Sequence, residues 1–128
     1  MPAKSFKDLI IWQRSIQLVE DIYELTRSFP KEETYGLRAQ IRRAVVSIPS
    51  NMAEGFARRH NAEYKQFLYV SLGSLAETST QPIVTKNPGY PSRENAERQL
   101  AEAEEISKMA MGLIKKLTQQ PEVPNTNN

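Results

Sequence analysis

The chain has 128 residues, of which 39% are hydrophobic and 25% are charged, and it carries a formal net charge of +2 at pH 7. This is an ordinary soluble globular composition, and a chain of this length buries about two-thirds of its unfolded surface in one domain. The absence of cysteine excludes disulfides, thiolate catalysis and sulfur-ligated metals. The sequence has neither an apolar run of about 18 residues nor a signal-peptide pattern. We therefore expect a single cytoplasmic domain over residues 1–120, with no membrane partner.

The first predicted helix covers residues 6–27. Ser5 and Asp8 have the spacing of a capping box at its start. Two apolar rows run along it, although a single core-facing stripe needs only one. The rows are Leu9, Trp12, Ile16, Val19 and Tyr23, and, about 100° round the helix, Ile11, Leu18, Ile22 and Leu25. Either both rows are buried in the same bundle or one faces another subunit. We favour the second interpretation, with Ile11, Leu18 and Ile22 as interface candidates.

A second helix is predicted over residues 35–58, and it has two stripes. The apolar stripe recurs at steps of three and four, and consists of Leu37, Ile41, Ala44, Val45, Ile48, Met52 and Phe56. A polar stripe runs beside it, formed by Arg43, Ser47, Asn51, Glu54 and Arg58. Pro49 predicts a bend rather than a break, because the apolar period continues on both sides of it. Gly55 marks a point of loosening or of close helix approach.

The rest of the chain predicts two more helices and a tail. A short linker after residue 58 makes the helix over residues 62–84 an antiparallel neighbour of the one before it. Pro82 predicts a kink or a frayed end in that helix, and Gly73 is interpreted as a packing site. A helix over residues 92–119 follows from its apolar period. Residues 121–128 are polar and predict a disordered tail. The fold class is therefore all-α, an antiparallel up-down-up-down four-helix bundle.

Three segments resemble a known family. They are FKDLIIWQ at residues 6–13, FPKEETYGLRAQIRRAVVSIPSNMAEG at 29–55 and GSLAE at 73–77. Together they resemble the bacterial four-helix-bundle family named after proteins encoded in intervening sequences of large-subunit ribosomal RNA genes. The resemblance covers residues 5 to about 118. It implies a ring-like homopentamer, and a distant relationship to the accessory protein of diversity-generating retroelements, which binds nucleic acid and a reverse transcriptase.

The chain departs from the pattern of this family after the GSLAE motif. Relatives typically continue with a leucine-rich segment, whereas residues 78–90 are TSTQPIVTKNPGY, with Thr78, Pro82 and Pro88 in place of leucines. The loss of apolar side chains and the added prolines should destabilise this helix, by several kcal/mol if nothing compensates. We expect the assembly to be affected as well.

The sequence gives no sign of catalytic machinery. It offers no nucleophile with a base, no metal cage and no phosphate-cradling loop. His60 lies in a basic linker without an assigned partner, and Glu54 and Glu77 are interpreted as structural acceptors, since buried charges are normally paired. We therefore expect no enzyme activity, no cofactor and no metal site.

Positive charge is concentrated in one part of the sequence, since Tyr35 to Tyr69 contains six cations and two anions. Two hypotheses follow. The first is an oligomeric bundle that binds the RNA or DNA backbone. Its candidate contact residues are Arg38, Arg42, Arg58, Arg59 and Lys65. A ring of copies would multiply this local charge. The alternative is a homo-oligomeric protein-interaction scaffold with no nucleic-acid role, whose interface candidates on this helix are Arg43, Ser47, Asn51 and Glu54.

Overall fold

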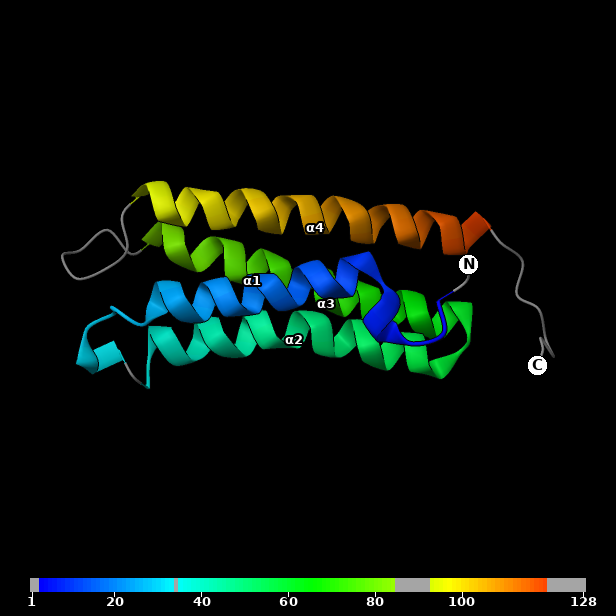
Figure 1. Cartoon of the computed structure of the whole chain (residues 1–128), viewed down its shortest axis with the longest axis horizontal. Helices are drawn as coiled ribbons and strands as arrows, with labels where there is room; N and C mark the ends of the chain where they lie inside the picture. The colour runs from blue at the N-terminus through cyan, green and yellow to red at the C-terminus, as the bar shows by residue number, and fades with distance from the viewer. Residues whose placement is uncertain (1–2, 34, 85–92, 120–128) are drawn as a thin grey trace.

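The computed structural model describes residues 3–33, 35–84 and 93–119, and within these ranges it contains four α-helices and no strand. The helices are α1 (Ile10–Thr26), α2 (Leu37–Arg58), α3 (Asn61–Val84) and α4 (Arg93–Gln119), with two 3-10 turns, η1 (Phe6–Asp8) and η2 (Lys31–Glu33). Successive helices run in opposite directions along one long axis (Figure 1). The all-α four-helix bundle is therefore confirmed. The tail predicted at 121–128 lies outside the described residues.

The N-terminal segment forms two elements rather than one helix over residues 6–27. The capping box of Ser5 and Asp8 is present, but it closes η1 and not α1. Leu9 then adopts an extended conformation, with φ −78° and ψ 125°, and α1 begins at the next residue. This break allows Phe6 to pack edge-on against Trp12, with ring centroids 5.1 Å apart. The other predicted helix boundaries agree with the structure to within two residues. None of the described helices has the length and apolar character of a membrane span.

One apolar row of α1 and most of the other belong to the bundle itself. Ile11, Leu18 and Ile22 are buried, with exposed fractions of 6%, 0% and 1%. They share one core with residues of the other three helices, which include Ile41, Val45, Ile48, Met52, Leu68, Leu75, Ala103, Ile106 and Ala110. Leu9, Trp12 and Val19 of the second row pack against the same core. Since α1 contacts both α2 and α4, it needs a wide apolar face. The interpretation of Ile11, Leu18 and Ile22 as subunit-interface residues is therefore wrong for this structure.

The backbones of α2 and α3 approach closely at Gly55. A Cβ atom there would lie 2.7 Å from the Cβ of Phe67 and 3.2 Å from the carbonyl oxygen of Tyr64, so the position has no room for a side chain. The prediction of a close approach at Gly55 is confirmed. Gly73 is different, because it is exposed and an added Cβ would meet nothing within 4 Å. Its interpretation as a packing site is wrong within this chain.

The second half of α3 is helical despite the departure from the family pattern. Thr78 is 2% exposed, and its hydroxyl donates to the carbonyl oxygen of Ser74 at 2.8 Å. The buried threonine therefore leaves no unsatisfied hydroxyl in the core. The helix continues to Val84, beyond Pro82, so its backbone does not fray there. The predicted kink at Pro82 stays a prediction, and Pro88 lies outside the described residues.

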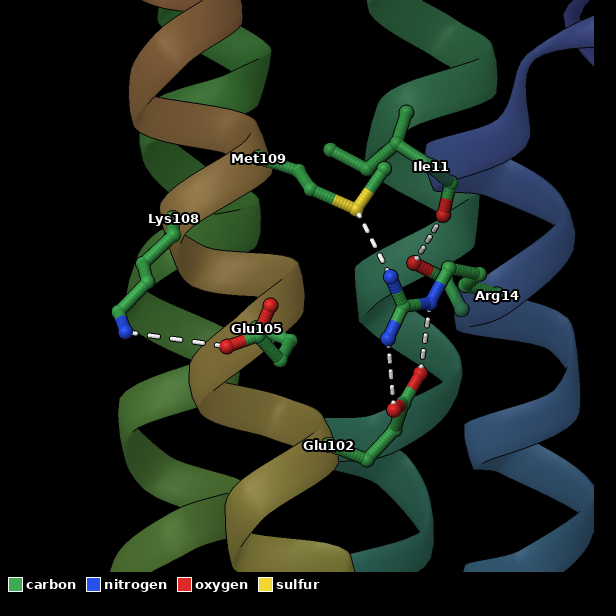
Figure 2. Close-up of polar contacts among 7 residues, drawn as sticks. Ile11, Arg14, Glu102, Glu105, Lys108 and Met109 are labelled. Atoms are coloured by element: carbon green, nitrogen blue, oxygen red, sulfur yellow. Dashed lines mark hydrogen bonds and ion pairs between the residues drawn. The ribbon is translucent and has the colours of Figure 1, made fainter.

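An ion pair joins α1 to α4. The guanidinium of Arg14 donates through Nε and Nη2 to the two carboxylate oxygens of Glu102, at 2.9 and 2.8 Å, and Nη1 lies 3.5 Å from the sulfur of Met109 (Figure 2). The hydrogen bonds to Glu102 raise the pKa of Arg14 above its ordinary value. Two parallel bonds restrict the relative position of the helices more than a single contact does. The pair thus specifies the register of α1 against α4.

The two glycines of α2 and α3 give a stability test. Gly55→Ala should destabilise the fold by about 1–2 kcal/mol, because overpacking against Phe67 outweighs the higher helix propensity of alanine. Gly73→Ala, the matched control on an open surface, should stabilise it by about 0.5–1 kcal/mol. Urea unfolding followed by circular dichroism measures both changes. Equal shifts of the two midpoints in one direction would contradict the close contact at Gly55.

Candidate functional site

The polar stripe of α2 is used within the chain, and Ser47 joins it to α3. The hydroxyl of Ser74 donates to Ser47 Oγ at 2.9 Å, and the buried hydroxyl of Ser71 donates to the carbonyl oxygen of Ile48 at 2.9 Å. The Nδ2 atom of Asn51 donates to the carbonyl and to the hydroxyl oxygen of Ser47, both at 2.8 Å. Hydrogen bonds of this kind satisfy polar groups at a tight helix contact. Ser47 and Asn51 therefore have a role within the chain that does not need a second subunit.

The two ends of the polar stripe differ. Glu54 is bonded to Arg58 at 3.0 Å, one turn along the same helix. Arg43 is exposed, and no hydrogen bond or ion pair involves it within the described part of the chain. Of the four interface candidates on α2, only Arg43 thus presents an uncompensated charge to the outside.

Arg42 is engaged at the C-terminal end of α1. Its Nε donates to Thr26 Oγ1 at 2.9 Å, its Nη2 donates to the Tyr23 carbonyl oxygen at 3.0 Å, and its guanidinium lies 4.3 Å from the centroid of the Tyr23 ring. A cation is favourable there, because the last carbonyls of a helix have no partner within it. Burial, together with the nearby charges of Arg38 and Arg27, lowers the pKa of Arg42 from its ordinary value. Arg42 is therefore a structural group of the α1–α2 contact.

The five predicted nucleic-acid contacts are divided between the two ends of the bundle. Arg38 and Arg42 lie near the start of α2, and Arg42 is sixteen residues from Arg58, which is about 24 Å along the helix. Arg58, Arg59 and Lys65 lie together at the other end, around the turn that joins α2 to α3. We call this region the turn end (at the right in Figure 1). The structure thus brings together three of the five candidates and separates two.

At the turn end, Arg58 is compensated and Arg59 is not. Arg58 lies 3.0 Å from Glu54 and 4.0 Å from Glu63, and its guanidinium is 5.2 Å from the ring centroid of Phe67. Arg59 is exposed, and no ion pair involves it within the described residues. It has φ 64° and ψ 24°, the left-handed conformation that usually selects glycine after a helix. The tight turn therefore holds the Arg59 side chain outside the bundle.

Aromatic rings form the support beneath this turn. Phe56 and Tyr64 pack edge-on with centroids 5.9 Å apart, on either side of the turn. Burial raises the pKa of Tyr64 to about 12, which reflects the apolar surroundings of its phenol. The two rings stabilise the turn by packing and contribute no charge to its surface. The exposed chemistry of the turn end is that of its cations.

The C-terminal turns of α4 add two lysines to the turn end. Lys65 Nζ lies 3.4 Å from Thr118 Oγ1, which places the start of α3 beside the end of α4. Lys115 and Lys116 are exposed and lie within one turn of Thr118. They lie outside the basic segment of residues 35–69 and are not among the predicted contacts. A signal was present, since residues 106–119 contain three lysines and no acidic residue.

Comparison with known proteins decides the family. The model of the family described as 23S rRNA-intervening sequence protein matches residues 7–112. The chain belongs to this family. Among solved structures, a protein of unknown function from the S23 ribosomal protein family of Bacteroides thetaiotaomicron VPI-5482 is 22% identical, with a TM-score of 0.75 over 83% of this chain and 99% of that chain. A comparison with curated proteins finds no match. The family resemblance predicted from the three segments is confirmed, and the structural likeness extends to the fold.

Neither comparison gives this intervening-sequence protein an activity. The structural relative has unknown function, and the family description names no reaction. Within the described residues, no group of three or more histidine, aspartate or glutamate side chains is arranged to hold a metal ion. An open depression lies between the end of α1 and the start of α4, and its lining includes Asp21, Glu24 and Arg98. Among the described residues its lining has one hydroxyl, that of Ser28, and neither a histidine nor a lysine, so the cationic turn end is the stronger candidate.

The engagement of Arg42 can be tested against its neighbour in sequence. Arg42→Met keeps the apolar stem but removes the bonds to α1, so it should reduce the free energy of unfolding by about 1–2 kcal/mol. Arg43→Met is the matched control, and it should change stability by less than about 0.5 kcal/mol because no contact is lost. Urea denaturation of both variants provides the comparison. If Arg42→Met changed the free energy of unfolding as little as the control does, the contacts of Arg42 with the end of α1 would not stabilise the fold.

Proposed function

We propose that this intervening-sequence protein is a non-enzymatic helical-bundle protein that binds the backbone of RNA or DNA through its turn end. The residues assigned to this interface are Arg59, Lys65, Lys115 and Lys116, with Arg58 at its edge. The observation that carries the proposal is the position of Arg59, a cation fixed in a backbone conformation that favours glycine. The family description names no activity, so support comes from charge and geometry.

The charge balance of the turn end supports an anionic ligand. It combines five cations with two anions, Glu54 and Glu63. Both carboxylates lie within 4.0 Å of Arg58, so their negative charge is directed at that one arginine. Among the described residues, the other four cations have no carboxylate partner. A surface of this kind favours phosphates, which are bound mainly through lysine and arginine.

The backbone of Arg59 supports the same ligand. A non-glycine residue in the left-handed conformation costs about 1 kcal/mol, and glycine would avoid that cost. An arginine at this position is unfavourable for stability alone. A long cation at the apex of the turn is useful if it contacts a phosphate, since strained backbone positions cluster at functional sites.

The variant Arg59→Gly separates stability from binding. It should stabilise the fold by about 1 kcal/mol, because the strain is relieved, and it should also weaken nucleic-acid binding. The slope of log K against log salt concentration should become shallower by about 1, as expected for the loss of one phosphate contact. Fluorescence anisotropy with labelled RNA and DNA at several salt concentrations measures the slope, and urea unfolding measures the stability.

Further variants set the limits of the interface. The double variant Lys115→Ala and Lys116→Ala should also reduce affinity and salt dependence. Arg27→Ala is the matched control, because Arg27 is an exposed cation at the opposite end of the bundle, and among the described residues its ion-pair partner is Glu24. The proposal is contradicted if the wild type does not bind nucleic acid at low salt. It is also contradicted if Arg27→Ala and Arg59→Gly reduce the affinity for nucleic acid equally.

The exposed charge of Arg43 favours a second candidate function, that of a homo-oligomeric protein-interaction scaffold. Val46, on the outer side of the same helix, is 39% exposed, so Arg43 lies near apolar surface that a partner could cover. An uncompensated arginine beside such surface is typical of protein interfaces, where arginine is enriched. On this hypothesis, the partner is another copy of the chain, and nucleic acid has no role.

Mass measurement in solution tests this second candidate. The wild type should be larger than a monomer, and Arg43→Ala should shift it toward the monomer in light scattering. Arg43 is a cleaner position than Asn51, whose amide already bonds within α2. A monomeric wild type, or an assembly that Arg43→Ala leaves intact, would exclude Arg43 as the subunit contact.

A further inference from the structure

The facing halves of α3 and α4 at the turn end contain no acidic residue. Residues 64–76 of α3 and residues 106–119 of α4 include four lysines, and neither segment has an aspartate or a glutamate. In contrast, residues 93–105 at the other end of α4 contain five glutamates. The bond between Lys65 and Thr118 sets these segments side by side in antiparallel directions. The pair therefore forms a continuous surface without negative charge, about 20 Å long.

An exposed tyrosine lies on this surface among the lysines. Tyr69 is 60% exposed and follows Lys65 by one turn on the same side of α3. Lys65 and Thr118 lie at the same level of the bundle, since they are in contact. Measured from that level along the bundle axis, helix geometry places Lys115 about 4.5 Å away and Tyr69 about 6 Å away. Met111, 61% exposed, follows about 6 Å beyond Lys115 on α4. Along this face, two cations near the turn are thus followed by two exposed side chains with apolar surface, Tyr69 and Met111.

We infer that this α3–α4 face binds single-stranded nucleic acid, with the phosphates on Lys65 and Lys115 and a base stacked on the ring of Tyr69. The inference rests on the proposed function and specifies its ligand. Proteins that bind single strands combine a cationic track with aromatic rings on which bases stack. In a duplex the base faces are covered by neighbouring base pairs, so Tyr69 can stack only on a base that is unpaired. The occupant is a single strand, RNA or DNA.

Tyr69 can be changed without a loss of core packing, because most of its surface is in solvent. A labelled RNA of about 16 nucleotides, the upper site size of one small single-strand-binding fold, is titrated with the protein alone and after annealing to its complement. Tyr69→Ala should weaken single-strand binding roughly 5- to 100-fold, the range for removal of one stacking ring, and should leave duplex binding unchanged. Tyr69→Phe should retain wild-type affinity, because the ring remains. Tyr35→Ala is the control, a tyrosine 94% exposed next to the opposite end of α2.

Each other outcome overturns the inference in a distinguishable way. If Tyr69→Ala binds like the wild type while Arg59→Gly binds weakly, stacking is wrong and the proposed function remains. If Tyr69→Phe is as weak as Tyr69→Ala, the hydroxyl and not the ring is the contact. If Tyr69→Ala lowers the mass of the free protein in light scattering, the residue lies between two copies of the chain. If the wild type binds neither probe, nor the DNA strand and duplex of the same sequence, the proposed function fails, and this inference fails with it.

Discussion

The close contact between α2 and α3 determines the geometry of the turn end. Gly55 leaves no room for a side chain, and the hydroxyls of Ser71 and Ser74 bond across to α2, so the two backbones are held together over several turns. The connection between such close helices has to be short, and only Arg59 and His60 lie between them. A reversal over two residues requires a left-handed backbone, and Arg59 adopts it. The left-handed turn at the apex is thus a consequence of the small residues that bring the two helices together farther along.

The sequence predicts the helices well because their apolar period is a local property. At Gly55 it leaves loosening and close approach open, and at Gly73 it favours a packing contact that the fold does not make, because a glycine in a helix is compatible with either environment. It does not predict which surface covers an apolar row. Ile11, Leu18 and Ile22 have the period of a buried face, but the period is the same whether the partner is another helix of the chain or another subunit. The bundle itself covers them, because α1 packs between α2 and α4.

The candidate site was predictable only in part, because its residues come from distant segments. Arg58, Arg59 and Lys65 are close in sequence, but Lys65 reaches Thr118 across 53 positions, and only the fold places the lysines of α4 there. For Arg42, the sequence suggests an exposed contact where the structure has a structural one. Its charge counts toward a basic segment in the sequence, yet the structure directs it to Tyr23 and Thr26 at the end of α1. The residue composition of a segment predicts whether its charge is positive or negative. The tertiary contacts determine which of those charges remain exposed to solvent.

The two functional hypotheses concern different sides of the molecule. Among the described residues, α2 contacts α1 and α3 but not α4, so α2 and α4 occupy diagonal corners of the bundle. Arg43 lies on the outer side of α2, whereas Lys115 and Met111 lie on the outer side of α4. A neighbour bound at the Arg43 side would leave the α3–α4 face open to solvent. Self-association and nucleic-acid binding are therefore compatible in one molecule, and an assembly through α2 would repeat the cationic α3–α4 face once per copy.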